Sequence, residues 1–171
     1  MMASEQQVPT DEQHRAARPT VIHVRAKKPS ITLAETGFTV VSGYVEQFWQ
    51  SALGPTSTAL IRHLARHRLP VGGESASYVP IDLALTRAAL GIGRKGQEGK
   101  SGPLFKSVHR LARFGFLTVD EHVLEAPSHI TIATHVHTVP DGIRRHWPDE
   151  LALRHDAFIE QVLGEEGDGL E

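Results

Sequence analysis

The period of the apolar residues changes from helical to alternating after residue 114, and that change constrains the fold more than any other feature. From residue 44 to residue 114 apolar side chains recur at helical spacing, and from residue 116 to residue 139 they alternate with polar ones. Helical spacing gives each helix one apolar face, whereas alternation is typical of a half-buried strand. The sequence therefore predicts a fold that is mainly α with a small β-hairpin, within the α+β class. The predicted helices span 44–52, 56–65, 80–90 and 103–114, and the predicted hairpin strands span 116–124 and 129–139.

Turn and capping residues set the limits of the second and third helices. Gly54 and Pro55 end the first helix, and Thr56 or Ser57 can cap the second through a side-chain oxygen. Pro80 suits the first position of the third helix, because its missing N–H has no intrahelical partner there. The residues predicted to be buried in that third helix are Ile81, Leu85 and Ala88.

The chain divides into a main domain, a helical extension and two tails. Residues 1–18 have no apolar periodicity and are predicted to form a disordered arm, and the acidic residues 164–171 are predicted to form a disordered tail. Residues 19–140 form the predicted main domain, and residues 141–163 form a C-terminal helical extension. Weak strand patterns within the main domain cover 21–24 and 38–41.

The C-terminal extension contains a helix that begins at Trp147-Pro148 and carries one apolar stripe. This stripe either covers the core of the same chain or pairs with a second subunit in a homodimer, and the sequence leaves both possibilities open. His155 and Asp156 are predicted to lie on the solvated face of this helix. The stripe, and therefore the candidate dimer contact, consists of Leu151, Phe158, Ile159 and Val162.

Charge is distributed unevenly along the chain, although the whole sequence has a net charge of only −2. Residues 87–113 contain seven bases and one acid, a net charge of +6, whereas residues 120–171 have a net charge of −9. A local excess of bases is the electrostatic footprint of a nucleic-acid partner. The alternative is a basic face that is merely solvated, so the position of the bases in the fold must decide.

Two segments, 81–93 and 102–119, resemble the winged helix-turn-helix module of bacterial regulators of the broad MarR and GntR kind. The first, IDLALTRAALGIG, is an apolar helix that ends in Leu90-Gly91, and the second, GPLFKSVHRLARFGFLTV, contains an R-L-x-x-x-G-hydrophobic ending at residues 110–116. The resemblance implies a winged helix domain, with an additional N-terminal strand or helix and a C-terminal helix, whose second helix enters the major groove of DNA. The connection 92–101 is longer than the three or four residues usual in such a turn.

The helix predicted over 103–114 has a cationic stripe at positions i, i+3, i+4 and i+7. DNA recognition needs cations for the phosphates and Arg or Ser side chains within reach of base edges. The basic, glycine-rich loop before the helix adds backbone N–H groups that suit a phosphate. The predicted DNA-binding residues are Arg94, Lys95, Lys100, Lys106, Ser107, His109, Arg110 and Arg113.

The same loop contains two partial matches to nucleotide-binding motifs. Residues 91–96 match G-x-G-x-x-G, but the dinucleotide motif follows a strand, and the pattern before residue 91 is helical. Residues 99–101 match the end of a P-loop, but Arg94 occupies the place of its first glycine. The sequence therefore predicts no cofactor.

Eleven histidines and the absence of cysteine limit the metal chemistry. Without cysteine there is no thiolate zinc site and no disulfide. His63 with His67, and His135 with His137, have chelating spacings, but each pair provides only two ligands. We therefore predict no metal site. The sequence also has no nucleophile elbow and no H-E-x-x-H motif, so an enzyme is not predicted.

These patterns together predict a sequence-specific double-stranded DNA-binding protein, a bacterial transcriptional regulator that reads the major groove with helix 103–114. No run of residues approaches the 18 apolar residues of a membrane helix, so the expected location is cytoplasmic and nucleoid-associated. Three alternatives remain open: a replication or partition protein of a plasmid or phage, a metal-responsive regulator with histidine ligands, and a winged helix used for protein–protein contact.

Overall fold

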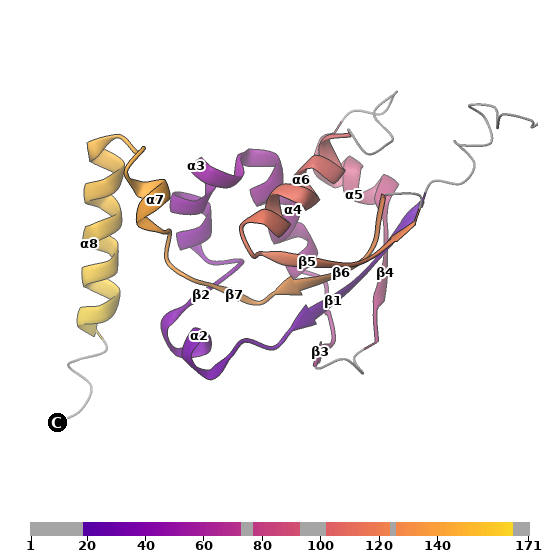
Figure 1. Ribbon diagram of the computed structural model, residues 1–171, viewed down its shortest axis with the longest axis horizontal. Coiled ribbons are helices and arrows are strands. Elements are labelled where there is room, and N and C mark those ends of the chain that lie inside the picture. The colour runs from indigo at the N-terminus through magenta and orange to yellow at the C-terminus, as the bar shows by residue number, and fades with distance from the viewer. Residues whose placement is uncertain (1–18, 73–76, 93–101, 124–125, 166–171) are drawn as a thin grey trace, which may run out of the picture.

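The computed structural model describes residues 19–72, 77–92, 102–123 and 126–165, and within them five strands form one mixed sheet (Figure 1). The strands of this sheet are β1 (Val21–Lys27), β3 (Val71–Gly72), β4 (Val79–Asp82), β5 (Leu117–Val123) and β6 (Ala126–Ala133). A second, two-stranded sheet pairs β2 (Phe38–Thr39) with β7 (His135–Val136). The helical elements are α2 (Ile31–Thr36), the π-helical turn η1 (Val45–Trp49), α3 (Gln50–Leu53), α4 (Pro55–Ala65), α5 (Leu83–Ala89), α6 (Pro103–Arg113), α7 (Asp141–Arg144) and α8 (Asp149–Glu165).

The N-terminal strand β1 lies inside the sheet and corrects the predicted fold class. It pairs in parallel with β6, and on its other side it pairs with β4 in antiparallel and with β3 in parallel orientation. The predicted hairpin exists as β5 and β6, but it is one edge of a larger sheet. A mainly α fold with a small hairpin is therefore wrong, and the fold is α+β. The sequence pattern missed this because β1 and β6 pair residues 106 positions apart, such as Val24 with Ile130.

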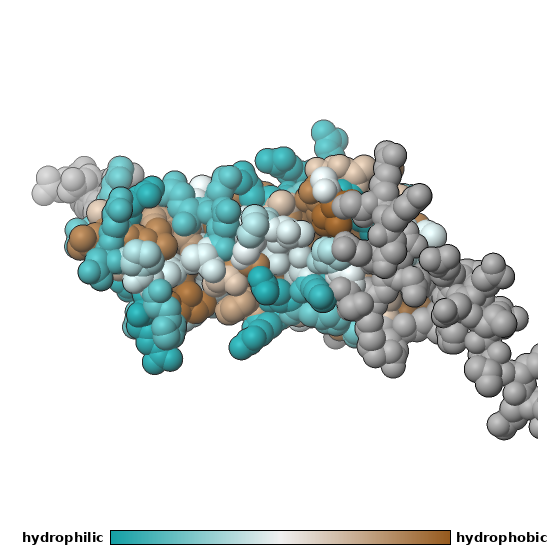
Figure 2. Space-filling view, turned by 90° about the horizontal axis from the view of Figure 1, so that it is seen from above, coloured by the Kyte–Doolittle hydropathy of each residue, from teal (hydrophilic) through white to brown (hydrophobic). Residues whose placement is uncertain are grey.

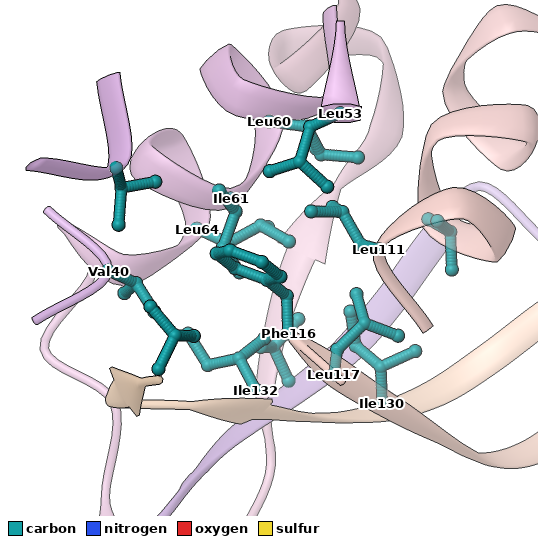
Figure 3. Packing of buried hydrophobic residues seen from close by; sticks show 14 of the residues in the cluster. Val40, Leu53, Leu60, Ile61, Leu64, Leu111, Phe116, Leu117, Ile130 and Ile132 are labelled. Atoms are coloured by element: carbon teal, nitrogen blue, oxygen red, sulfur yellow. The ribbon is translucent and has the colours of Figure 1, made fainter. Parts of the chain in front are cut away.

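One face of the sheet is covered by helices, and the core lies between the two layers. Figure 1 shows α3, α4, α5 and α6 on the same side of the sheet. Alternate residues of β1 and β6, including Val24, Ile130 and Ile132, point toward these helices and are buried. Figure 3 shows how side chains from α4 and α6 meet them around Phe116; among those labelled there are Leu60, Ile61, Leu64 and Leu111.

The other face of the sheet carries a cluster of polar side chains. Arg25 Nε donates to Thr131 Oγ1 at 2.8 Å, and the Thr131 hydroxyl donates in turn to Asp120 Oδ2. The hydroxyl of Tyr78 donates to the same carboxylate at 3.0 Å, and the Arg25 guanidinium lies 4.7 Å from the centre of the Tyr78 ring. The two faces of β1 are thus apolar and polar, which is the alternation expected for a strand with one buried face.

The region predicted as the start of the third helix is a strand. Residues 79–82 form β4, and α5 begins only at Leu83, where Asp82 caps it by accepting the Leu85 N–H at 2.8 Å. Leu85 is 72% exposed, so its predicted burial is wrong, and Ala88 is exposed as well. Pro80 of β4 pairs with His23 of β1. Because β4 lies at an edge of the sheet, it can tolerate the missing N–H of the proline.

The first two helical segments lie where the apolar period predicts them, but their boundary differs. Tyr44, Phe48 and Trp49 are buried, as the stripe over 44–52 predicts. The N-cap of α4 is Gly54, with a φ of +75° and no side-chain cap, and neither Thr56 nor Ser57 has the predicted capping role. Both lie in the first turn of α4 instead.

Helix α8 lies at one end of the molecule beside α7 (Figure 1). The rings of Tyr44 and Phe48 approach that of Phe158 with centroids 5.6 Å apart in each case. His155 is 3% exposed, so the prediction that it lies on a solvated face is wrong. It lies four residues after Leu151 and three before Phe158, which places it on the same face as the apolar stripe.

Candidate nucleic-acid interface

Helix α6 is shaped by a proline at its start and a glycine after its end. Pro103 occupies the first helical position after Gly102, and Gly115, with a φ of +75°, turns the chain into β5. Only a residue that tolerates the left-handed region is unstrained at such a turn. The face turned toward α4 and the sheet is apolar and buried, and it consists of Leu104, Phe105, Val108 and Leu111.

The opposite face of α6 is basic and exposed. The four predicted stripe residues, Lys106, His109, Arg110 and Arg113, are all exposed, as their spacing predicts. None of the four forms an ion pair with a carboxylate of the described residues. The positive charges of Lys106, Arg110 and Arg113 are therefore not neutralised within this part of the protein. Seen from above in Figure 2, hydrophilic and neutral residues occupy most of the helical side of the molecule, and hydrophobic ones form separate patches.

Arg110 is the stripe residue that is fixed in place. Its Nη1 donates to the carbonyl oxygen of Leu53, the last residue of α3, at 3.2 Å. A guanidinium group has five N–H donors, so most of them remain for a ligand. Arg113 lies at the C-terminal end of the stripe, with its guanidinium 5.9 Å from the centre of the Phe114 ring.

The other predicted DNA-binding residues lie elsewhere. Ser107 is only 6% exposed and belongs to the side of α6 that faces α4, so it is not part of the exposed stripe. Arg94, Lys95 and Lys100 lie outside the described residues. The helix α5, and not a strand, precedes the glycine-rich segment that starts at Gly91.

A pocket of about 140 Å³ lies beside the stripe, where the first turns of α4 and α6 meet. Lys106 and Arg110 line it together with Ser57 and Ser107, and no acidic residue is among its lining residues. Sequence reasoning missed this pocket because it depends on how α4 packs against α6. The available signal was the Gly-Pro pair before each helix, at residues 54–55 and 102–103, which leaves both N-termini without a capping side chain.

The histidine pairs do not form a metal centre in the described part of the chain. The Nε2 atoms of His63 and His67 lie 3.5 Å apart on α4. A pocket beside them includes His67 and His135, one residue from each predicted pair. Even so, the described residues contain no group of three or more His, Cys, Asp or Glu side chains that could hold a metal ion.

The candidate dimer contacts on α8 lie against the core of their own chain. Leu151, Phe158 and Ile159 are half-buried and pack on the hydrophobic core, and Val162 is half-buried. Leu153, on another face of the helix, is 70% exposed. The apolar stripe of α8 thus covers part of the hydrophobic core of its own chain.

Comparisons with known proteins give no match: no family model fits the chain, and neither a curated protein nor a solved structure is significantly similar to it. Among the described residues, no helix has the length and apolar character needed to cross a membrane.

Proposed function

We propose that this protein binds double-stranded DNA by placing the exposed basic face of α6 in the major groove. The observation that carries the proposal is the stripe Lys106–His109–Arg110–Arg113, which is exposed along the whole helix and has no carboxylate partner among the described residues. Unpaired cations along one helix provide the sequence-independent attraction to phosphates on which DNA affinity depends. An α-helix also fits the width of the major groove.

The order of elements around α6 supports the same proposal. Helix α4, strand β4, helices α5 and α6, and the β5–β6 hairpin follow one another along the chain. This order resembles a helix-turn-helix followed by a wing. In such modules the second helix reads the groove and the first crosses the backbone. The proposed reader is α6, and the protein is proposed to act as a sequence-specific transcriptional regulator.

The proposal is tested by measuring the affinity for a random-sequence duplex by fluorescence anisotropy at a series of salt concentrations. The double variant Lys106→Ala/Arg113→Ala should bind more weakly, and the slope of log K against log salt should become shallower by about 0.9 for each lost phosphate contact. Arg154→Ala, an exposed arginine on α8, is the matched control and should bind like the wild type. Absence of salt-dependent binding by the wild type would contradict the proposal.

Sequence specificity needs a second measurement. Genomic fragments that co-purify with the protein should share a motif, and binding to that motif should exceed binding to random duplex by a factor of about 10³ or more. If Arg113 contacts a base edge as well as a phosphate, Arg113→Ala should lose about 1–3 kcal/mol more on the motif than on random duplex. Equal affinity of the wild type for both duplexes would restrict the function to non-specific binding.

A further inference from the structure

Two helix N-termini open onto the pocket between α4 and α6, and neither is capped by a side chain. The N-cap residues are Gly54 and Gly102, and a proline follows each of them. In α4 the first backbone N–H to form a helical hydrogen bond is that of Thr58, which donates to the carbonyl oxygen of Gly54. In α6 it is that of Lys106, which donates to the carbonyl oxygen of Gly102. The amides before these have no acceptor within their helix, and among the residues that carry them, Thr56 and Ser57 of α4 line the pocket.

Two serine hydroxyl groups in the same pocket have no hydrogen-bond partner among the described residues. Ser57 and Ser107 are 3% and 6% exposed, and both line the pocket. Neither side chain forms a hydrogen bond with any residue in the described ranges. Both hydroxyl groups can therefore donate a hydrogen bond to an acceptor that occupies the pocket.

The rim of the pocket is cationic and tightly built. Lys106 and Arg110 line it, and the bond from Arg110 to the Leu53 carbonyl holds the guanidinium there. A Cβ atom on Gly54 would lie 3.1 Å from Arg110 Nη1, and the φ of +75° at Gly54 also disfavours any side chain. The close approach of this backbone to Arg110 therefore requires glycine.

We propose that this pocket binds a phosphate group. Its polar side chains are the hydroxyls of Thr56, Ser57 and Ser107, the ammonium of Lys106 and the guanidinium of Arg110, and the uncapped start of α4 adds backbone N–H groups. No carboxylate is among the described residues that line it. This combination is the one that recognises a tetrahedral oxyanion. Where the ligand is DNA, the inference rests on the proposed function, and the phosphate is a backbone phosphodiester that fixes the register of α6 in the groove.

Thermal unfolding of the full chain with inorganic phosphate, against chloride at equal ionic strength, tests the pocket directly. The wild-type melting temperature should rise with phosphate, because a ligand that binds only the folded state stabilises it. In Ser57→Ala/Ser107→Ala the phosphate affinity should fall at least tenfold. Its melting temperature without phosphate should stay equal or rise, since no hydrogen bond is lost and alanine favours helices. Ser77→Ala, an exposed loop serine, should behave like the wild type. The same phosphate response in the double variant, or none in the wild type, would overturn the proposal.

Duplex binding by the same proteins separates the two sources of the phosphate. A several-fold loss of affinity for every duplex in the double variant assigns the pocket to the DNA backbone. Unchanged duplex binding, with phosphate binding lost, assigns it to a free phosphorylated ligand and leaves the proposed function intact. A wild type that responds to phosphate but binds no duplex retains the pocket and refutes the proposed function.

Discussion

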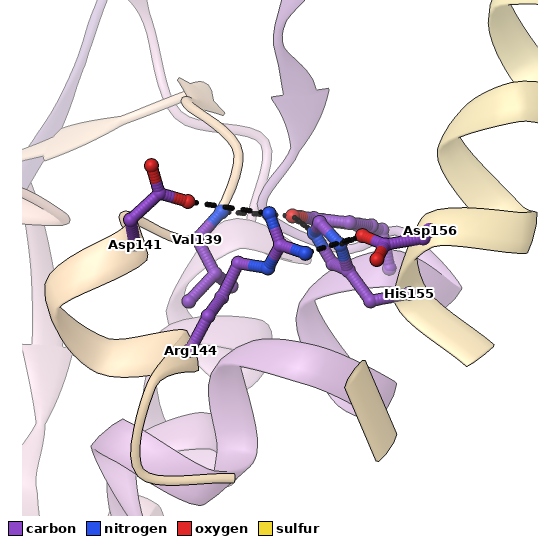
Figure 4. A network of polar contacts seen from close by, with 6 residues as sticks. Val139, Asp141, Arg144, His155 and Asp156 are labelled. Carbon is purple, nitrogen blue, oxygen red and sulfur yellow. Dashed lines mark hydrogen bonds and ion pairs between the residues drawn. The ribbon is translucent and has the colours of Figure 1, made fainter. Parts of the chain in front are cut away.

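The phenol oxygen of Tyr44 lies 2.8 Å from Nε2 of His155, and this bond joins the start of η1 to α8 (Figure 4). The same oxygen accepts the backbone N–H of Val139 at 2.8 Å. Nδ1 of His155 lies 3.3 Å from a carboxylate oxygen of Asp156, which also pairs with Arg144. In the tautomer whose Nδ1–H faces the carboxylate, Nε2 of His155 accepts a hydrogen bond from the Tyr44 hydroxyl. One hydroxyl thus connects three separate segments of the chain.

Removing this hydroxyl should destabilise the protein. In Tyr44→Phe the Val139 N–H and the His155 Nε2 both lose a partner in a buried site, which costs about 1–3 kcal/mol. Urea unfolding should show a lower midpoint with an unchanged slope. Tyr78→Phe is the matched control: its hydroxyl is bonded to Asp120 at an exposed position where water can replace it, so the midpoint should change less. Equal losses in the two variants would contradict this ranking.

The stability should fall at alkaline pH because of Tyr44. Burial raises the pKa of Tyr44 from 10.0 to about 12, although the Val139 N–H and the charge of Arg144 act in the opposite direction. Between these values the unfolded chain loses its proton first, so the free energy of unfolding should decrease by up to about 1.4 kcal/mol per pH unit. Tyr44→Phe should remove this slope. If the free energy of unfolding of Tyr44→Phe still decreases with pH at the same rate, the decrease arises from other groups.

The stability should also fall in mild acid because of His63. Burial, and then the charges of His67 and Arg66, lower the pKa of His63 below 6.5. The unfolded chain therefore takes up the proton first, and stability is lost as the pH falls through about 6.5. His63→Gln should weaken this dependence in denaturant melts at several pH values, whereas His122→Gln, at an exposed position of β5, should not. Identical pH dependence in both variants would refute the assignment.

Two open glycine positions should respond oppositely to alanine. Gly115 has a φ of +75°, and Gly142 lies inside α7 without a positive φ; at neither does a Cβ meet an atom within 4 Å. Gly115→Ala should cost about 1–2 kcal/mol through backbone strain alone. Gly142→Ala should stabilise by about 0.4–1 kcal/mol, since alanine is the better helix former. Thermal melts of both variants measure the difference, and a loss at Gly142 equal to that at Gly115 would exclude the φ-based explanation.

The two faces of α6 should separate stability from DNA binding. Leu111 is fully buried, and Leu111→Ala should cost about 2–5 kcal/mol through the cavity it leaves. Arg113→Ala changes an exposed residue and should alter the free energy of unfolding by no more than about 0.5 kcal/mol. Below its melting temperature, Leu111→Ala should keep its duplex affinity, whereas Arg113→Ala should bind the duplex more weakly. Loss of duplex affinity in folded Leu111→Ala alone would contradict this division.

The spacing of apolar residues was sufficient to predict those elements in which burial depends only on the residues of one helix or one hairpin. The spacing of Leu104, Val108 and Leu111 predicts α6 and its exposed stripe, and the turn at Gly115 is visible in the sequence. His155 was predictable too, since it continues the stripe from Leu151, but a charged neighbour at Asp156 favoured the wrong face.

Elements that depend on distant partners could not be predicted in this way. Pro80 is a good first residue of a helix, and only its pairing with His23 makes residues 79–82 a strand. The phosphate pocket likewise needs α4 and α6 to meet, which no local spacing reveals. Ser107 looks like a stripe residue in the sequence, yet the packing of α4 buries it.

The place of β1 inside the sheet also sets the order in which the molecule can be completed during synthesis. The Ile22, Val24 and Ala26 side chains belong to the first strand of the described residues, but their parallel neighbour β6 ends only at Ala133. In a nascent chain, β1 therefore has no β6 to pair with until all the helices that cover the sheet, from α3 to α6, have been synthesised. Pairing across such sequence separations is slow. In the growing chain β1 is thus the strand most in need of protection from other partners.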